Sequence, residues 1–199
     1  MIVQVDLKYG RPLIPLDLER VQYIVLHHIA AKTATPAQIH QWHLDRGWNG
    51  AGYNEYIRKD GTVHIMRGDH IGAQCHGYNS KSYGIAVEGD YDKERFMPLA
   101  QMNSLAKRIA FHEKRLPNLK ETVPHSAFAA TACPGAHFPT KFVSAVSTHW
   151  AEEIYESLTT SYGLEIHEKR FDDKITRGEA MALIAQALDS LKYYIDHHR

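Results

Sequence analysis

The stretch Val21-Gln22-Tyr23-Ile24-Val25-Leu26-His27-His28 decides the fold. Its apolar run is typical of a strand that is buried on both faces of a sheet. Such a strand delivers its last residues to the rim of the sheet, where we expect His27. His28 points to the opposite face, because side chains alternate along a strand. Only one of the two can serve a given site, and we choose His27.

A second stretch, Pro124-His125-Ser126-Ala127-Phe128-Ala129-Ala130-Thr131-Ala132-Cys133-Pro134-Gly135, carries an imidazole and a thiol. Zn²⁺ binds both groups, and His27 is the best candidate for a third ligand. Two His and one Cys leave one position open to water, whose pKa can fall toward about 7, so the predicted reaction is hydrolysis of a carbonyl compound. Taken singly, His27 also fits a sheet-edge histidine, and Cys133 fits a small buried apolar residue.

Length and composition set the outer limits. The 199 residues suffice for one ordinary domain and a small second one. The hydrophobic share of 44% and the charged share of 23% are those of a soluble globular protein. Lys plus Arg and Asp plus Glu both number 23, so net charge gives no reason to expect a nucleic acid or a membrane as a partner.

Cysteine usage and the N-terminus bear on the compartment. Cys75 and Cys133 are the two cysteines, and a disulfide between them is disfavoured because small secreted scaffolds usually carry more. The N-terminus has no basic segment followed by an apolar one, so we predict no signal peptide. No stretch approaches the roughly 18 apolar residues of a spanning helix. We therefore expect a protein made in the cytoplasm that is not exported by the usual signal.

Local signals predict a mixed α/β fold. Thr35 as a cap, Pro36 in the first turn and Gln38 in a capping box start a helix that runs to about Arg46 and stops at Gly47. The remaining expected elements are hairpin strands at 52–57 and 62–66 joined through Asp60-Gly61, a strand at 84–89 in the centre of the sheet, and helices beginning at Pro98 and Phe138. The predicted fold class is a mixed central β-sheet flanked by helices.

The sequence pattern changes near His149, beyond which it is typical of helices. Thr176-Arg177-Gly178-Glu179 is a second capping box. The apolar residues that follow it share one helical face: Met181, Ile184, Leu188, Leu191 and Ile195. We therefore predict a main domain over 1–148 and a small α-helical module over 149–199.

Two hydroxyl groups are candidates for catalysis. A Tyr53 hydroxyl aimed at the metal water would position it or donate to a developing oxyanion, although a core tyrosine is an alternative. Thr131, two residues before Cys133, would add a second donor, although a local turn-capping role is the alternative.

Six short motifs come in the order and spacing of a known family: Val25-Leu26-His27-His28, Gly47-Trp48, Gly52-Tyr53-Asn54, Lys59-Asp60-Gly61-Thr62-Val63, Gly77-Tyr78-Asn79-Ser80-Lys81-Ser82-Tyr83-Gly84-Ile85 and His125 through Cys133-Pro134. From about residue 20 to 147 the chain resembles the type 2 N-acetylmuramoyl-L-alanine amidases, which include amidase-type phage lysozymes and animal peptidoglycan recognition proteins. The resemblance implies Zn²⁺ on His27, His125 and Cys133, with Tyr53 as the catalytic tyrosine. We also predict substrate contacts at Trp48 and Asn79, which lie in these motifs.

The implied activity is hydrolysis of the amide bond between N-acetylmuramic acid and L-alanine in peptidoglycan. We interpret the chain as a phage or prophage endolysin that waits in the host cytoplasm for a separate membrane pore. One alternative is a cytosolic amidase that recycles soluble muropeptides. The other is a non-catalytic peptidoglycan-binding protein, as in relatives that have lost a zinc ligand.

Two positions depart from the family pattern. Some members carry Lys where this chain has Thr131, while others have Thr and remain active. Relatives often read Gly-x-His where this chain reads Gly72-Ala73-Gln74-Cys75-His76. That difference puts one substrate-facing contact in doubt, and His76 is a candidate replacement.

The C-terminal part resembles a single S-layer homology repeat, through Trp150-Ala151, Tyr162-Gly163-Leu164, Phe171 and Ile175-Thr176-Arg177-Gly178-Glu179-Ala180. The resemblance implies binding to a secondary polymer of Gram-positive cell walls, with Arg177 as the anion contact. A purely structural helical hairpin remains the alternative, because the Thr-Arg-Gly-Glu box also has a plain capping explanation.

Overall fold

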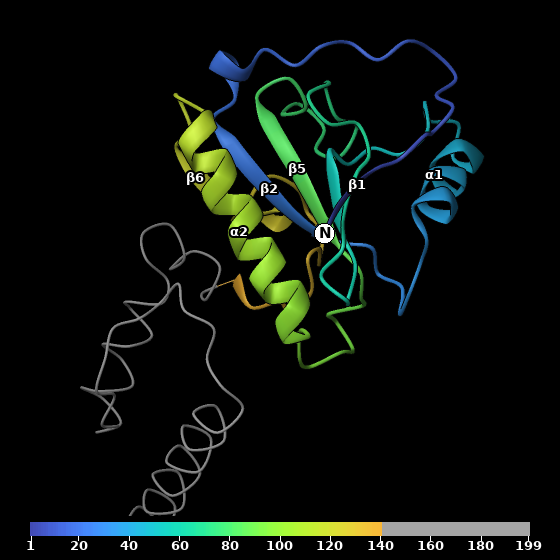
Figure 1. The fold of residues 1–199 in the computed structure, drawn as a ribbon, viewed down its shortest axis with the longest axis vertical. Helices are drawn as coiled ribbons and strands as arrows, with labels where there is room; N and C mark the ends of the chain where they lie inside the picture. Colours follow the sequence, from blue (N-terminus) through green and yellow to red (C-terminus); the bar gives the residue numbers. More distant parts are fainter. Residues whose placement is uncertain (141–199) are drawn as a thin grey trace, which may run out of the picture. The chain divides into compact units, whose positions relative to one another are not determined.

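The computed structural model describes residues 1–140, which form a six-stranded mixed sheet with helices (Figure 1). The strands are β1 (Ile2–Gln4), β2 (Tyr23–His28), β3 (Glu55–Ile57), β4 (Val63–Ile65), β5 (Ser82–Val87) and β6 (Glu121–Pro124). The helices are α1 (Pro36–Asp45) and α2 (Leu99–Arg115), with short 3₁₀ turns η1 (Leu18–Arg20) and η2 (His125–Ala127). The strand order β1-β4-β3-β5-β2-β6 confirms the predicted mixed α/β class.

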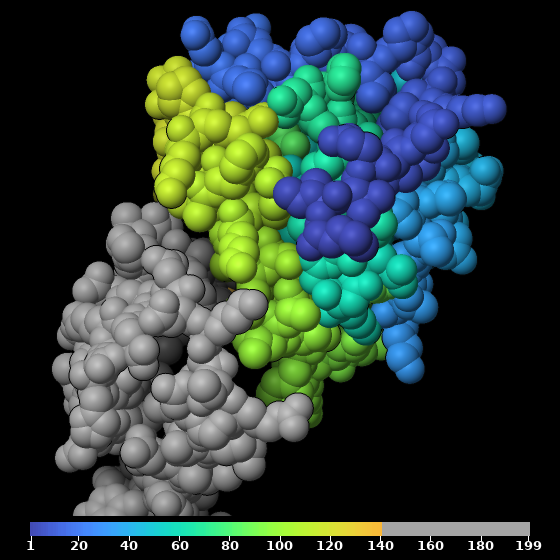
Figure 2. Space-filling view, viewed as in Figure 1, coloured from blue at the N-terminus to red at the C-terminus, as the bar shows by residue number. Residues whose placement is uncertain are grey.

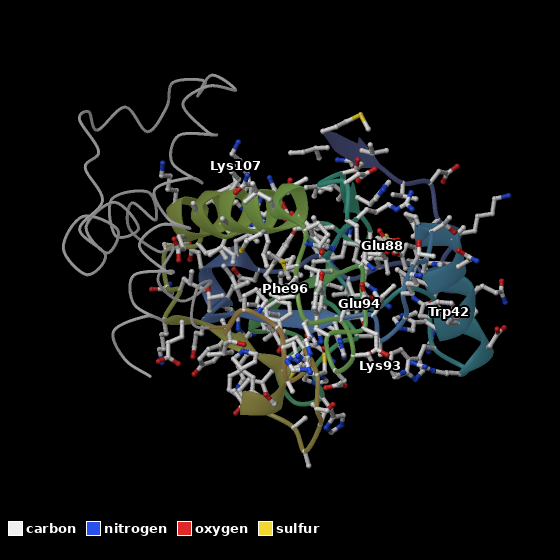
Figure 3. The ribbon with its side chains drawn as sticks, turned by 90° about the horizontal axis from the view of Figure 1, so that it is seen from below. Trp42, Glu88, Lys93, Glu94, Phe96 and Lys107 are labelled. Carbon is white, nitrogen blue, oxygen red and sulfur yellow. The ribbon has the colours of Figure 1, made fainter. Side chains whose placement is uncertain are left out.

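The core lies between α2 and one face of the sheet. Alternate residues of the central strands, Ile24 and Leu26 of β2 and Ile85 of β5, are fully buried there against Leu105 and Ile109 of α2. Figures 1 and 3 show α2 lying along this face. The sequence predicted β2 as a buried strand and β5 as a central one, and both are confirmed.

The opposite face of the sheet carries smaller side chains. Gly84 and Ala86 of β5 pair in register with Val25 and His27 of β2. Ala86 packs in a second apolar cluster with Ile39 of α1. Because glycine and alanine take little space, this face leaves room for polar side chains beside His27.

Helix α1 begins as its sequence predicted. The Thr35 hydroxyl accepts from the Gln38 N–H at 3.2 Å, and the Gln38 side chain accepts from the Thr35 N–H at 2.8 Å. Pro36 opens the helix, which ends at Asp45. Gly47 follows with φ of 77°, a left-handed conformation that glycine adopts without strain.

The hairpin of β3 and β4 is antiparallel, as predicted, but β3 begins only at Glu55. The prediction of strand from residue 52 is wrong for its first residues, because the Asn54 side chain, and not a backbone carbonyl, pairs with the Gly84 N–H. Its amide oxygen accepts from the Gly84 N–H at 2.8 Å, and its amide nitrogen donates to the carbonyls of Gly68 and His70. Tyr53 therefore lies in the irregular segment that precedes β3.

Two edge strands carried no clear sequence signal. β1 pairs in parallel with β4, and β6 pairs in parallel with β2. The space-filling view shows the N-terminal residues packed over the hairpin segment (Figure 2). Both strands are short, so their few residues show little periodicity, and only the pairing with a neighbour defines them.

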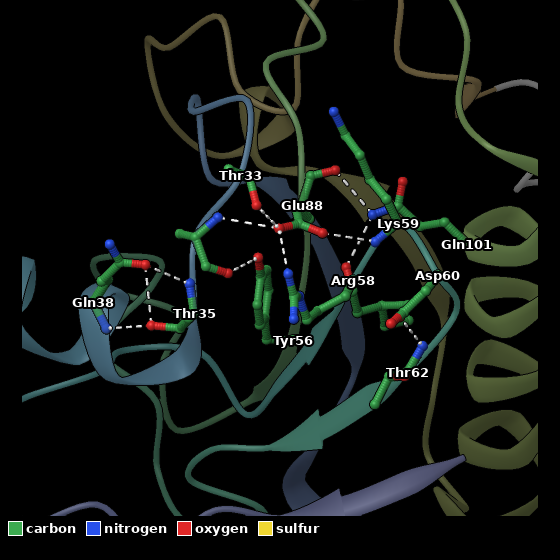
Figure 4. Close-up of polar contacts among 12 residues, drawn as sticks. Thr33, Thr35, Gln38, Tyr56, Arg58, Lys59, Asp60, Thr62, Glu88 and Gln101 are labelled. Atoms are coloured by element: carbon green, nitrogen blue, oxygen red, sulfur yellow. Dashed lines mark hydrogen bonds and ion pairs between the residues drawn. The ribbon is translucent and has the colours of Figure 1, made fainter.

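Glu88, directly after β5, ties the loop before α1 to the hairpin (Figure 4). Its carboxylate accepts from the Thr33 hydroxyl at 2.6 Å, the Ala34 N–H at 3.1 Å and the Lys59 N–H at 2.8 Å. Burial would raise the pKa of this carboxyl, but these hydrogen bonds outweigh burial and lower it. Glu88 therefore stays ionised and holds the loop before α1 against the hairpin of β3 and β4.

Cys75 and Cys133 are both free thiols, as predicted. Among residues 1–140, no helix has the length and apolar character needed to cross a bilayer. The helix predicted from Phe138 onward and the module predicted over 149–199 lie outside the described residues, apart from the first residues of that helix.

A buried ion pair fastens α2 to the sheet. The Glu55 carboxylate accepts from Arg108 Nε at 2.8 Å and from His112 Nε2 at 2.9 Å. Burial would raise the pKa of Glu55, but the hydrogen bonds from His112 and Arg108 outweigh burial and lower it to about 2. Removing one partner of such a pair leaves a buried charge without compensation.

We expect Arg108→Met to lower the free energy of unfolding by about 3 kcal/mol at neutral pH. The folded pKa of Glu55, about 2, lies below its ordinary value of 4.5. The stability that it contributes is therefore present above pH 4.5 and is lost as the pH falls toward 2. The difference between wild type and variant should shrink over that interval in urea unfolding measured at a series of pH values.

Lys107→Met is the matched control, because Lys107 lies on the outer, exposed side of α2 (Figure 3). It should change the free energy of unfolding by less than about 0.5 kcal/mol. A loss at Arg108 no larger than the loss at Lys107 would contradict the role of the ion pair.

Candidate metal centre

The pairing of β2 with β6 brings the two predicted histidine ligands together. The strands are parallel, with Leu26 in register with Pro124. The next residue of each strand, His27 and His125, therefore emerges at the same edge of the sheet. Their ring centroids are 4.6 Å apart.

Cys133 returns to this edge at the end of the irregular segment that follows β6. Its Sγ lies 3.6 Å from His27 Nδ1. One ligand atom from each of His27, His125 and Cys133 lies within 4.8 Å of the others. The structure thus brings His27 together with two predicted ligands that follow it by 98 and 106 residues in the chain.

An aromatic cluster holds the segment that carries His125 and Cys133. The Phe128 ring stacks on Tyr78 with centroids 3.8 Å apart and meets Tyr23 edge-on at 4.9 Å. The Ser126 N–H also donates to the Cys133 carbonyl at 3.0 Å, which closes the segment on itself. Sequence reasoning missed this cluster, because its members come from three separate segments.

Burial keeps the two histidines that are predicted ligands uncharged. It lowers the pKa of His27 to about 3, with a further lowering by His125, and it also lowers the pKa of His125. Burial raises the pKa of the Cys133 thiol to about 11. At neutral pH both imidazoles therefore offer a lone pair, while the thiol must lose its proton to a bound metal.

Tyr53 faces this group of ligands. Its ring centroid lies 5.2 Å from that of His27 and 5.4 Å from that of His43. Burial raises the pKa of the Tyr53 hydroxyl, so the group stays protonated and remains a hydrogen-bond donor.

His43 of α1 supports two predicted site residues. Its Nδ1 accepts from the Gly52 N–H at 2.9 Å, one residue before Tyr53. Its ring lies 4.8 Å from that of Trp48, whose side chain is partly exposed. Burial, aided by the nearby Arg46 and Arg67, lowers the pKa of His43 to about 4, so the ring is neutral and Nδ1 can accept. Sequence reasoning did not single out His43.

Thr131 and Asn79 both make local backbone contacts. The Thr131 hydroxyl is exposed and accepts from the Cys133 N–H at 3.2 Å, which is the turn-capping role. The Asn79 amide oxygen accepts from the N–H groups of Gln74 and Cys75, both at 2.9 Å. These contacts occupy the acceptor oxygen of each side chain and hold the loops that surround the candidate metal centre.

Position 74 faces His27 and not the exterior. Gln74 is buried and its Oε1 lies 2.5 Å from His27 Nε2, whereas His76 is exposed. The departure from the family pattern thus concerns a partner of a ligand histidine.

His28 lies on the other side of the strand, as predicted. Its Nδ1 accepts from the Tyr91 N–H at 3.1 Å, and it is absent from the group of three ligands. It lies near Asp90 and Asp92, but Asp90 is already paired with Lys93 at 2.8 Å. Arg177, the predicted wall contact, lies outside the described residues.

Comparisons with known proteins agree with this geometry. Residues 17–136 match the profile of a family described as N-acetylmuramoyl-L-alanine amidase. The chain is 38% identical over 104 residues to the endolysin of Enterobacteria phage K11, covering 49% of this chain and 67% of that protein. It is 34% identical over 142 residues to peptidoglycan-recognition protein LB of Drosophila melanogaster, covering 61% and 60% of the two chains.

A solved amidase structure is also similar to this chain. The N-acetylmuramoyl-L-alanine amidase LysC from Clostridium intestinale URNW superposes with a TM-score of 0.67 at 33% sequence identity. The match covers 73% of this chain and 95% of that structure.

Proposed function

Because this chain belongs to the N-acetylmuramoyl-L-alanine amidase family, we propose that it is a zinc-dependent endolysin of a phage or prophage. The bond hydrolysed is the amide between N-acetylmuramic acid and L-alanine. The family match, the phage K11 endolysin and the LysC amidase support peptidoglycan amidase activity. The zinc and the phage role are the further steps of the proposal.

One observation carries the zinc proposal, namely the donor set of His27, His125 and Cys133 within 4.8 Å. Two imidazoles and one thiolate are ligands that Zn²⁺ prefers, and three protein ligands are typical of catalytic sites. Bound there, zinc would polarise the scissile carbonyl and make a coordinated water acidic enough to attack it at neutral pH. The contact of 3.6 Å between His27 Nδ1 and Cys133 Sγ fits two neighbouring ligands of one tetrahedral ion.

Tyr53 is the residue that would stabilise the developing oxyanion. Its hydroxyl is protonated, and its ring packs beside His27. A donor placed in advance at this position costs no reorganisation during the reaction. Thr131 would act beside it, since a hydroxyl that accepts from the Cys133 N–H retains its own proton to donate.

The substrate contacts would come from the surface around the metal centre. Trp48 offers a partly exposed aromatic face of the kind that packs against a sugar ring. Asn79 keeps its amide N–H₂ available for a glycan or peptide carbonyl, since its oxygen holds the Gln74 loop.

Likeness to peptidoglycan-recognition protein LB keeps peptidoglycan binding without hydrolysis as the second candidate. Binding alone requires only the exposed surface residues. The complete donor set and the Tyr53 hydroxyl favour hydrolysis. A cytosolic amidase that recycles muropeptides would use the same site. Such an amidase would differ from an endolysin in acting only on soluble peptidoglycan fragments.

Cys133→Ala is the decisive test of the metal proposal. Without its thiolate ligand, the chain should lose most of its zinc and nearly all release of peptide stems from purified peptidoglycan. The fold should survive, because the two apolar clusters do not include Cys133. Metal content by atomic absorption and new amino termini per milligram of wall are the measurements.

Cys75→Ala is the matched control, because it removes a buried thiol that lies outside the group of ligands. It should retain stoichiometric zinc and activity. Stoichiometric zinc and normal hydrolysis in Cys133→Ala would overturn the assignment. Comparable losses in His28→Ala and His27→Ala would mean that the wrong histidine was chosen.

Tyr53→Phe tests the oxyanion role, because it removes one hydroxyl and leaves the ring. We expect kcat to fall by about 10²-fold or more with zinc content unchanged. Thr131→Val should lower kcat in the same direction but by less. Turnover near wild type in Tyr53→Phe would reduce Tyr53 to a packing residue.

Residues 149–199 would form a wall-binding module, a proposal supported by the sequence pattern alone. Arg177 would contact carboxylate or pyruvyl groups, since a guanidinium binds such groups with two parallel hydrogen bonds. A structural helical hairpin is the alternative, in which Thr176 acts only as a cap.

Arg177→Ala should weaken co-sedimentation with intact walls and leave hydrolysis of small soluble muropeptides unchanged. Arg170→Ala is the matched control and should bind as wild type does. Unchanged sedimentation of Arg177→Ala, together with a loss of about 1 kcal/mol in Thr176→Ala, would favour the structural hairpin.

A further inference from the structure

We propose that Gln74 is a positioning residue that fixes the tautomer of His27, so that Nδ1 of His27 presents its lone pair to the metal. The inference rests on the proposed metal function and adds a residue to it. It starts from the two nitrogens of His27, which face different partners. Nδ1 lies 3.6 Å from Cys133 Sγ, and Nε2 lies 2.5 Å from Gln74 Oε1.

A neutral imidazole carries its proton on one nitrogen, and only the other nitrogen can bind a metal. An amide oxygen accepts hydrogen bonds and never donates them. If Gln74 Oε1 faces Nε2, the proton must reside on Nε2, which leaves the lone pair on Nδ1. The orientation of the Gln74 amide therefore decides which tautomer is present.

That orientation follows from a chain of hydrogen bonds that ends at a backbone carbonyl. Ser82 Oγ donates its one proton to the Tyr78 carbonyl at 2.9 Å. It must then accept from Gln74 Nε2, which lies 2.8 Å away. The amide nitrogen is thus assigned to the Ser82 side and the amide oxygen to the His27 side. A carbonyl cannot donate, so the reverse polarity would cost the hydrogen bond between Ser82 and the Tyr78 carbonyl.

The fold reserves space for this side chain. A Cβ on Gly84 would lie 2.6 Å from Gln74 Cγ and 2.7 Å from Cδ, which is closer than atoms can approach. Gly84 belongs to β5, so the glutamine crosses the central strand at the position that lacks a side chain. Asn79 accepts from the N–H groups of both Gln74 and Cys75 and holds the backbone at the start of the side chain.

Such outer partners orient a ligand histidine and raise its basicity, and their loss typically costs 10- to 100-fold in metal affinity. Gln74→Met keeps the length of the side chain and removes both polar groups. We expect its zinc dissociation constant to rise by about 10- to 100-fold in chelator competition with the full-length protein. Ser82→Ala should act in the same direction by less, since it frees the amide to turn.

The effects of the two substitutions on the free energy of zinc binding should not add, because both break the same chain of hydrogen bonds. The double variant Gln74→Met with Ser82→Ala should bind zinc no more weakly than Gln74→Met alone. Gln101→Met is the matched control, since Gln101 is also a buried glutamine and donates to the carbonyls of Ile57 and Glu88. It should lower stability and leave the zinc dissociation constant unchanged.

A second readout needs no metal. Imidazole ¹⁵N spectra of the zinc-free protein at neutral pH should show His27 protonated on Nε2 in wild type and on a mixture of nitrogens in Gln74→Met. An unchanged tautomer and an unchanged zinc dissociation constant in folded Gln74→Met would overturn the inference. Failure of wild type to bind zinc would instead overturn the proposed function, while the spectra would still decide the role of Gln74.

Discussion

The parallel pairing of β2 with β6 is the constraint on which the candidate site depends. Because Leu26 is in register with Pro124, the residues that follow, His27 and His125, leave the sheet at one edge. A shift of one residue in β2 would exchange His27 for His28 and turn the ligand to the other face. The apolar side chains of β2 that pack under α2 hold the register, since such a shift would turn them away from α2 and place His27 in the apolar core instead. Core packing thus determines which histidine faces the candidate metal centre.

The chemistry of the site follows from the small side chains of β5. Gly84 and Ala86 lie beside Val25 and His27, so this face of the sheet has room for a polar layer over the central strands. Gln74 occupies that room and contacts His27, while Tyr53 and His43 close the layer on the side of α1. The side chains of His27, His43, Tyr53 and Gln74 in this layer are all uncharged at neutral pH. The face of the sheet under α2 thus holds the main apolar core, and the opposite face holds the residues of the candidate site.

Much of this arrangement could be predicted from the sequence. The long strand β2, the capping box of α1 and the Asp60-Gly61 turn are local signals, and each appears where it was expected. The three metal ligands could be predicted because histidine and cysteine are the residue types that zinc prefers. Gln74, His43 and the stack of Phe128 on Tyr78 could not be found in this way. Their roles depend on contacts between segments that are distant in the sequence. No local sequence pattern predicts such contacts.

The way in which the ligand segment is held bears on whether a metal here would be structural or catalytic. A structural zinc usually has four protein ligands and organises chain that does not fold without it. The segment after β6 has its own supports, which are the Phe128 stack, the Ser126 bond to the Cys133 carbonyl, and the His137 N–H that donates to the Tyr91 carbonyl. Two of the three ligands, His125 and Cys133, lie on this segment, and His27 lies on β2. Three protein ligands on parts of the chain already fixed by protein contacts would leave the remaining position of an ion open to water and substrate. The binding energy of a metal would then not be needed to hold the segment, an arrangement that favours a catalytic site over a structural one.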